Sequence, residues 1–321
     1  MGHYMWSFTY VVNDIIDMGA SVGWEKEGIE ERPGCVWQWL AASVEGGRGA
    51  GAQKWLMAAR RRLNDFDMTR VPDWKLEHLI ESMDQAYVRC AVVSSWEYEF
   101  PFKGKKFLIS IPPEYVKKCI DKYPDRLIGS AEIPLTKGKD YALKYIERVV
   151  KEFGFRRIII TPSTGFYPND KDLCYPIYEK CIELGIPVGI LTGVEAVPGA
   201  RLKYSDPIYV DDVAVDFPDL KIRVAASGWM QNSEVAFALA YHNPNVYLTP
   251  SLPWPNLPMG WDFEKFKYAQ ELIPDRIMYA SSAPFVYPHS VSIQYVERMP
   301  LTEEFKEQFF RENAKRYLGI K

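Results

Sequence analysis

Two ionisable residues stand where a predicted strand ends and a loop begins, the position at which parallel barrels place their chemistry. Asp17 closes the apolar segment Val11–Asp17, and His289 follows the apolar segment Arg276–Ala280. A carboxylate in an apolar pocket has a raised pKa and can move protons, and an imidazole titrates close to neutral pH. We therefore predict Asp17 and His289 as catalytic residues. The alternative for Asp17 is structural: a buried carboxylate whose oxygens accept hydrogen bonds from the loop backbone.

Motifs of other chemistries are missing from the sequence. No Ser lies in a G-x-S-x-G string, and no Ser-His-Asp set can be assembled from sequence positions. No G-x-G-x-x-G or Walker sequence follows an apolar strand, which argues against dinucleotide and nucleotide cofactors. The five cysteines are scattered without C-x-x-C spacing, which favours a reducing, cytoplasmic location. We predict no cofactor.

Short segments rich in Val and Ile alternate with segments of helical period. The apolar runs predict eight strands, at Val11–Asp17, Arg89–Ser95, Arg126–Ala131, Arg156–Thr161, Ile186–Leu191, Lys221–Ala226, Asn245–Leu248 and Arg276–Ala280. Apolar residues three and four apart predict helices between them, for example at Tyr141–Phe153, Asp172–Leu184, Asp206–Phe217 and Ser233–His242. Repeats of about forty residues with no linker-like change of composition predict an α/β fold, a single (β/α)8 TIM barrel over residues 1–321.

The spacing of the repeats is broken at one place, between the first strand and its helix. Residues 20–73 lie between them. A loop of this length in a compact domain is usually functional or has structure of its own. Because loops that follow barrel strands lie at the C-terminal mouth, we predict that residues 20–73 form a lid over it.

The composition restricts the class of partner. The chain is 47% hydrophobic and 25% charged with a net charge of −3, which gives no field that favours nucleic acid or an anionic membrane. No stretch approaches the ~18 uninterrupted apolar residues of a membrane span, and no signal-peptide pattern opens the sequence. We predict a small-molecule substrate, with no nucleic-acid or membrane partner. Aromatic residues make up 14%, which fits a pocket wall or a subunit interface, and we expect a homo-oligomer or a hetero-oligomer with a related subunit.

Several strings resemble a known family in their order and spacing. They are Met83–Ala86, Phe166–Asp170, Tyr175–Lys180, Leu184–Val188, Asp206–Tyr209, Asp216–Ile222 and Asn243–Leu248. The chain is similar through them to the amidohydrolase 2 family, the metal-dependent decarboxylases, hydratases and hydrolases related to aminocarboxymuconate semialdehyde decarboxylase. The resemblance runs from about Val11 to Gly319 and implies a TIM barrel with its site at the C-terminal ends of the strands.

The residues at the family's metal-binding positions do not match the family. The Asp-x-His-x-His string after the first strand is matched by Asp17 to Ser21, and three further histidines and one aspartate are replaced. The replaced positions hold Gly19, Ser21, Thr161, Leu191, Ala226 or Ser227, and Ser282. These residues supply at best a neutral hydroxyl, whereas zinc and similar ions need imidazole, thiolate or carboxylate donors. We therefore predict no metal at this position.

A cavity without its metal is still a pocket, and the resemblance implies which side chains line it. Hydroxyls there can orient a carboxylate or carbonyl group, an arginine suits an anionic substrate, and an aromatic side chain can reach the mouth. We predict substrate-binding roles for Ser21, Thr161, Arg201, Ser227, Trp229 and Ser282.

Two functions of different classes stay open. One is a metal-independent lyase, hydratase or hydrolase for a small, partly apolar carboxylate or thioester, which the intact architecture and the retained Asp17 favour. The other is a non-catalytic pseudoenzyme, a binding or scaffold subunit beside an active paralogue, which the loss of every ligand favours. The fold does not decide between them.

Overall fold

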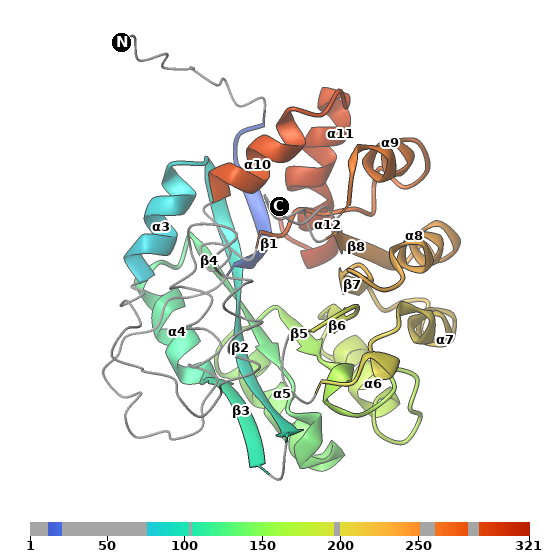
Figure 1. Ribbon diagram of the computed structural model, residues 1–321. Coiled ribbons are helices and arrows are strands. Elements are labelled where there is room, and N and C mark those ends of the chain that lie inside the picture. Colours follow the sequence, from blue (N-terminus) through green and yellow to red (C-terminus); the bar gives the residue numbers. More distant parts are fainter. Residues whose placement is uncertain (1–11, 21–75, 103–104, 196–199, 251–260, 282–288) are drawn as a thin grey trace.

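The computed structural model describes residues 12–20, 76–102, 105–195, 200–250, 261–281 and 289–321 (Figure 1). Seven parallel strands follow one another around the sheet: β1 (Ile15–Ala20), β2 (Val88–Phe102), β4 (Leu127–Glu132), β5 (Arg157–Ile160), β6 (Val188–Leu191), β7 (Ile222–Ala226) and β8 (Val246–Pro250). The segment after β8 closes the ring, because Met278 N donates to Leu248 O at 2.8 Å and Met18 N donates to Tyr279 O at 3.0 Å. The predicted TIM barrel is confirmed.

Helices surround the strands, as Figure 1 shows. They are α3 (Leu76–Asp84), α4 (Pro113–Lys122), α5 (Lys139–Lys151), α6 (Tyr175–Glu183), α7 (Val210–Asp216), α8 (Ser233–His242), α9 (Phe263–Leu272), α10 (His289–Glu297), α11 (Glu303–Glu307) and α12 (Asn313–Leu318). Their apolar faces have the period expected of helices on a sheet: α5, for example, buries Ala142, Tyr145, Ile146 and Val149. The apolar face of the helix therefore packs against the strands, as the sequence pattern predicts.

Three strand predictions differ from the structure. The first strand is Ile15–Ala20 rather than Val11–Asp17, so Asp17 lies within the strand instead of ending it. The last predicted strand, Arg276–Ala280, forms only a bridge between Leu248 and Ile277. Pairing with neighbouring strands, which an apolar run does not reveal, fixes both limits.

The third difference is a hairpin that leaves the barrel. The second half of β2 pairs antiparallel with β3 (Lys105–Ile111), from Trp96 opposite Ile111 to Phe102 opposite Lys105. The apolar run predicts that the strand ends at Ser95. The string from Trp96 to Phe102 alternates aromatic and polar residues at period two over most of its length, and this alternation is the signal that predicts a strand with two different faces.

The interior of the barrel is closed at its N-terminal end. Ile16, Met18, Val92 and Met278 form an apolar cluster with Tyr317 of α12. The Tyr317 hydroxyl donates to the carbonyl of Val188, the first residue of β6, at 2.9 Å. Access to the centre of the barrel is therefore from the C-terminal mouth.

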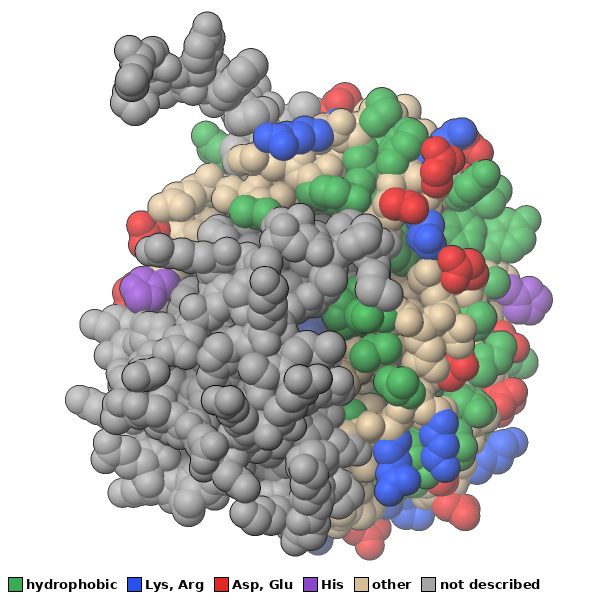
Figure 2. Space-filling view, in the orientation of Figure 1, with side chains coloured by type: hydrophobic (Ala, Val, Ile, Leu, Met, Phe, Trp, Pro, Cys, Tyr) green, Lys and Arg blue, Asp and Glu red, His purple; other side chains and the backbone are tan. Residues whose placement is uncertain are grey.

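Two further sequence predictions concern a lid over the mouth and a membrane partner. The proposed lid, residues 20–73, lies outside the described residues except for Ala20, the last residue of β1. Over the part of the chain that is described, every helix is too short or too polar to cross a membrane. On the face drawn in Figure 2, acidic and basic side chains of the described residues are interspersed.

Candidate functional site

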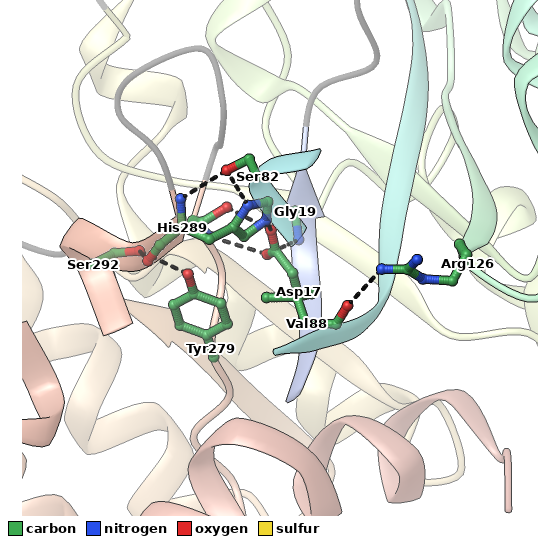
Figure 3. A network of polar contacts seen from close by, with 9 residues as sticks. Asp17, Gly19, Ser82, Val88, Arg126, Tyr279, His289 and Ser292 are labelled. Carbon is green, nitrogen blue, oxygen red and sulfur yellow. Dashed lines mark hydrogen bonds and ion pairs between the residues drawn. The ribbon is translucent and has the colours of Figure 1, made fainter. Parts of the chain in front are cut away.

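Asp17 and His289, far apart in the sequence, meet where β1 adjoins the start of α10 (Figure 3). His289 Nε2 lies 3.1 Å from Asp17 Oδ2, and both side chains are fully buried. The hydroxyl of Ser281 donates to the same oxygen at 2.5 Å, while the backbone N–H groups of Ser281 and Gly19 donate to Oδ1 at 3.0 and 2.9 Å. The two residues predicted as catalytic thus belong to one network.

Ser82 of α3 extends this network beyond His289. Its hydroxyl oxygen lies 2.9 Å from His289 Nδ1 and accepts the backbone N–H of His289 at 3.2 Å. The sequence had offered no Ser-His-Asp set, and the structure assembles one from α3, α10 and β1. Ser82 is buried on a helix outside the ring of strands, so the chain of contacts fixes α3 and α10 to β1 rather than presenting a nucleophile to substrate.

The charge state of Asp17 differs from our expectation. Burial raises the pKa of Asp17. The hydrogen bond and charge of His289, together with the hydrogen bonds from Ser281 and Gly19, lower it by more than burial raises it. The pKa of Asp17 therefore lies below its ordinary value, and the prediction of a raised pKa was wrong. The sequence does not show which groups donate hydrogen bonds to Asp17. Hydrogen bonds to an ionised carboxylate lower its pKa.

A second polar centre lies at the C-terminal ends of β4 and β5. Thr161 follows β5 and donates its hydroxyl to Glu132, the last residue of β4. Ser163, two residues further on, donates to Oε2 of Glu195 at 2.5 Å. One short turn after β5 thus holds two carboxyl groups through two hydroxyls.

The two carboxyl groups have raised pKa values for related reasons. Burial raises the pKa of Glu132 well above its usual range, and the charge of Glu195 raises it further against the opposing effect of two arginines. Burial also raises the pKa of Glu195, to about 7, although the hydrogen bond from Ser163 acts in the opposite direction. A carboxyl group that titrates near neutral pH can both donate and accept a proton there.

The side chains of two arginines lie inside the barrel. Arg157 and Arg223 donate to one oxygen, the carbonyl of Met18, at 2.8 and 2.9 Å. Arg157 also donates to the hydroxyls of Ser130 at 3.0 Å and Ser94 at 3.4 Å. Burial lowers the pKa of both arginines, and their mutual repulsion adds to this for Arg157, but a guanidinium keeps its proton in proteins. The barrel therefore encloses two positive charges.

The other residues predicted to bind substrate differ in how far they are buried. Ser227 is buried and donates its hydroxyl at 3.1 Å to the carbonyl of Val224, in the strand β7 that it follows. The side chain of Trp229 is half-buried, and that of Arg201 is exposed. Ser21 and Ser282 lie outside the described residues.

Four charged site residues escaped sequence reasoning. Glu132, Arg157 and Arg223 stand in strands made mostly of apolar and small residues, and a charged residue at a position facing the barrel interior is the signal that predicts them. Glu195 lies in the loop after β6 with nothing in its neighbourhood to distinguish it.

The chain was compared with known proteins. A family model described as Amidohydrolase matches residues 113–320. The comparison with curated proteins gave no match. Among solved structures, an uncharacterised TIM-barrel protein from Bordetella bronchiseptica is 22% identical with a TM-score of 0.70, over 95% of this chain and 98% of that one. These findings agree with the barrel described above.

Two further solved structures are enzymes by their names. 5-Carboxyvanillate decarboxylase from Novosphingobium aromaticivorans, complexed with manganese and 4-hydroxy-3-methoxy-5-nitrobenzoic acid, is 17% identical with a TM-score of 0.63, over 97% of each chain. 4-Oxalomesaconate hydratase from Rhodopseudomonas palustris is 18% identical with a TM-score of 0.59, over 95% of each chain. At this identity the likeness establishes the fold.

The donor set can be tested against a divalent cation such as manganese. Within the described ranges, no three His, Cys, Asp or Glu side chains are placed to hold a metal. Gly19, one residue before the end of β1, and Leu191, the last residue of β6, occupy two of the positions at which the family resemblance implies metal ligands. A Cβ atom on Gly19 would lie 3.9 Å from Nη2 of Arg223, so a side chain there would begin beside a positive charge. These residues do not fit a divalent cation.

Proposed function

The chain belongs to the amidohydrolase family, and from this premise we propose that it is a metal-independent lyase, hydratase or hydrolase acting on a small, partly apolar carboxylate or thioester. The observation that carries the proposal is the pair Glu132 and Glu195, held by the hydroxyls of Thr161 and Ser163 at the C-terminal ends of the strands. Strand ends are where TIM barrels place catalytic groups.

The three reaction types share one requirement. A decarboxylation returns a proton to the carbon that loses carbon dioxide, a hydration adds a proton and a hydroxyl across a double bond, and a hydrolysis needs a base for the attacking water. Each needs a group that moves protons near neutral pH. Glu195 suits this role because burial raises its pKa to about 7, and its half-buried side chain leaves it closer to solvent than Glu132.

The other residues of the centre assist Glu195. We assign Glu132 a supporting role in which its own carboxyl group stays protonated. Burial and the charge of Glu195 both raise the pKa of Glu132 and favour this form. Asp17 and His289, which we predicted as catalytic, are assigned a positioning role in this proposal, because both are fully buried and hydrogen-bonded to each other. Their network orients the end of β1 against α10.

Turnover assays on a panel of small carboxylates and thioesters test the proposal, with Glu195→Gln compared to Glu264→Gln. Glu264 is exposed on α9 and serves as the matched control. We expect wild-type turnover to survive chelation and Glu195→Gln to lose about 10²–10⁴-fold in kcat, with Glu264→Gln unchanged. Loss of activity on chelation with recovery on adding manganese would refute metal independence.

The second candidate function is a non-catalytic binding subunit. The observation that favours it is the donor set, since the described residues offer no group of three donors for a metal. It predicts that wild-type protein turns over no member of the panel and instead forms a stable complex with a catalytically intact relative. Turnover that depends on Glu195 would exclude it.

A further inference from the structure

Within the described ranges, the two arginines inside the barrel have no ionic partner in hydrogen-bonding contact. Among the described residues neither Arg157 nor Arg223 forms an ion pair, although both side chains are buried. Their acceptors are the carbonyl of Met18 and neutral hydroxyls, including that of Thr249, which accepts from Nε of Arg223 at 2.9 Å. Buried charges in proteins are normally paired or bind a ligand.

The charges around the arginines do not balance them. Asp17 acts on both at longer range and favours its ionised form, since its pKa is lowered by His289. Glu132 also acts on both, but burial raises its pKa and favours its neutral form. Of the described groups that act on the arginines, one carboxyl group thus favours its charged form while two guanidinium groups are positive, and an added anion balances the second.

The geometry brings the two guanidinium groups to one place. Because they contact the same Met18 oxygen at 2.8 and 2.9 Å, their Nη1 atoms are at most about 5.7 Å apart. Nη2 of Arg223 lies toward Gly19, where an added Cβ would be in ordinary contact with Ala280 at 3.6 Å and with Nη2 at 3.9 Å. Planar guanidinium groups with N–H donors on adjacent nitrogens match the two oxygens of a carboxylate.

We propose that Arg157 and Arg223 form an anion-binding site at the centre of the barrel, beside Gly19, that takes the carboxylate of the substrate. The assignment to substrate rests on the proposed function, whereas anion binding itself does not. Tyr317 closes the N-terminal end, so the anion enters from the C-terminal mouth. The site places a carboxylate below Glu132 and Glu195, which leaves the rest of the substrate facing the proton-transferring group.

Binding of two probes, benzoate and inorganic phosphate, tests the site without requiring turnover. Titration calorimetry at constant ionic strength compares wild type with Arg223→Gln and with Arg148→Gln, an exposed arginine on α5. We expect wild type to bind benzoate more tightly than phosphate. Arg223→Gln should weaken benzoate binding at least 10-fold and Arg148→Gln should leave it unchanged. Equal benzoate affinity in the two variants overturns the proposal.

A milder variant covers the case in which Arg223→Gln does not fold. Thr249→Val removes the hydroxyl that holds Nε of Arg223 and keeps the size of the side chain; it should weaken benzoate binding about 3- to 10-fold. Wild-type melting temperatures in benzoate and in sodium chloride of equal ionic strength give an independent measure, and equal temperatures overturn the proposal. If wild-type protein binds benzoate but turns over no substrate of the panel, the proposed enzyme function is rejected and the anion site stands.

Discussion

Replacing Glu195 by Gln should change how the stability of the protein depends on pH. The carboxyl group has a pKa of about 7 in the folded chain because of burial, compared with an ordinary value near 4.5 in the unfolded chain. Between these values the folded state binds more protons than the unfolded state, so the free energy of unfolding falls as pH rises from about 4.5 to about 7. Gln carries no titrating proton and removes this loss.

The size of this change in stability follows from the shift in the pKa of Glu195. At ~1.4 kcal/mol per pKa unit, the full difference corresponds to about 3.5 kcal/mol. The side chain is half-buried rather than enclosed, and solvent screening reduces the expectation to about 1–2 kcal/mol. The charge of Glu195 raises the pKa of Glu132. Glu195→Gln removes this charge and so makes Glu132 easier to ionise, which also reduces the loss of stability as pH rises.

Urea unfolding of wild type, Glu195→Gln and Glu264→Gln at several pH values between 5 and 8.5 measures the effect. The free energy of unfolding of Glu195→Gln relative to wild type should increase by about 1–2 kcal/mol across this range, while that of the exposed control Glu264→Gln stays constant. A difference between Glu195→Gln and wild type that is independent of pH, or that decreases as pH rises, would refute the reasoning.

Three further outcomes are expected. Elemental analysis of protein purified without chelator should find well below one zinc or manganese ion per chain, and a tightly held ion at full occupancy would contradict the donor-set argument. Asp17→Asn should lower the free energy of unfolding by about 1–3 kcal/mol with unchanged kcat per folded molecule; lost kcat at unchanged stability would make Asp17 catalytic. Gly193→Ala should cost more stability than Gly165→Ala in thermal unfolding, since both have positive φ but only at Gly193 would Cβ meet Trp229 N at 2.5 Å; equal losses would argue against that close approach.

The barrel could be predicted because local pattern and global topology agree along most of the chain. The string Arg156–Thr161 contains the buried strand Arg157–Ile160, and Ser233–His242 is a helix with the limits expected. The hairpin of β2 and β3 was missed because the pairing partner of β2 is the segment that follows it in the sequence, and a linear pattern does not show the pairing. Strand limits depend on such partners, which a linear pattern does not contain.

The site was predicted less completely, since its residues are neighbours only in space. Asp17 and His289 were found because each follows or ends an apolar strand pattern. Ser82 was out of reach because helix α3 presents it to His289 only after the chain has folded. The pKa direction of Asp17 depended on donors from Ser281 and Gly19 that no spacing rule indicates.

The two polar centres differ in what their hydrogen bonds allow. Asp17 accepts from Gly19, from Ser281 twice and from His289, and an ionised carboxylate with so many donors has little tendency to take a proton near neutral pH. The same contacts join β1 to α10, so this centre gains rigidity at the expense of reactivity. Glu195 has a hydroxyl donor in Ser163 and lies in a loop with part of its surface exposed. Fewer donors leave its proton exchangeable, and we therefore place proton transfer at Glu195 and orientation at Asp17.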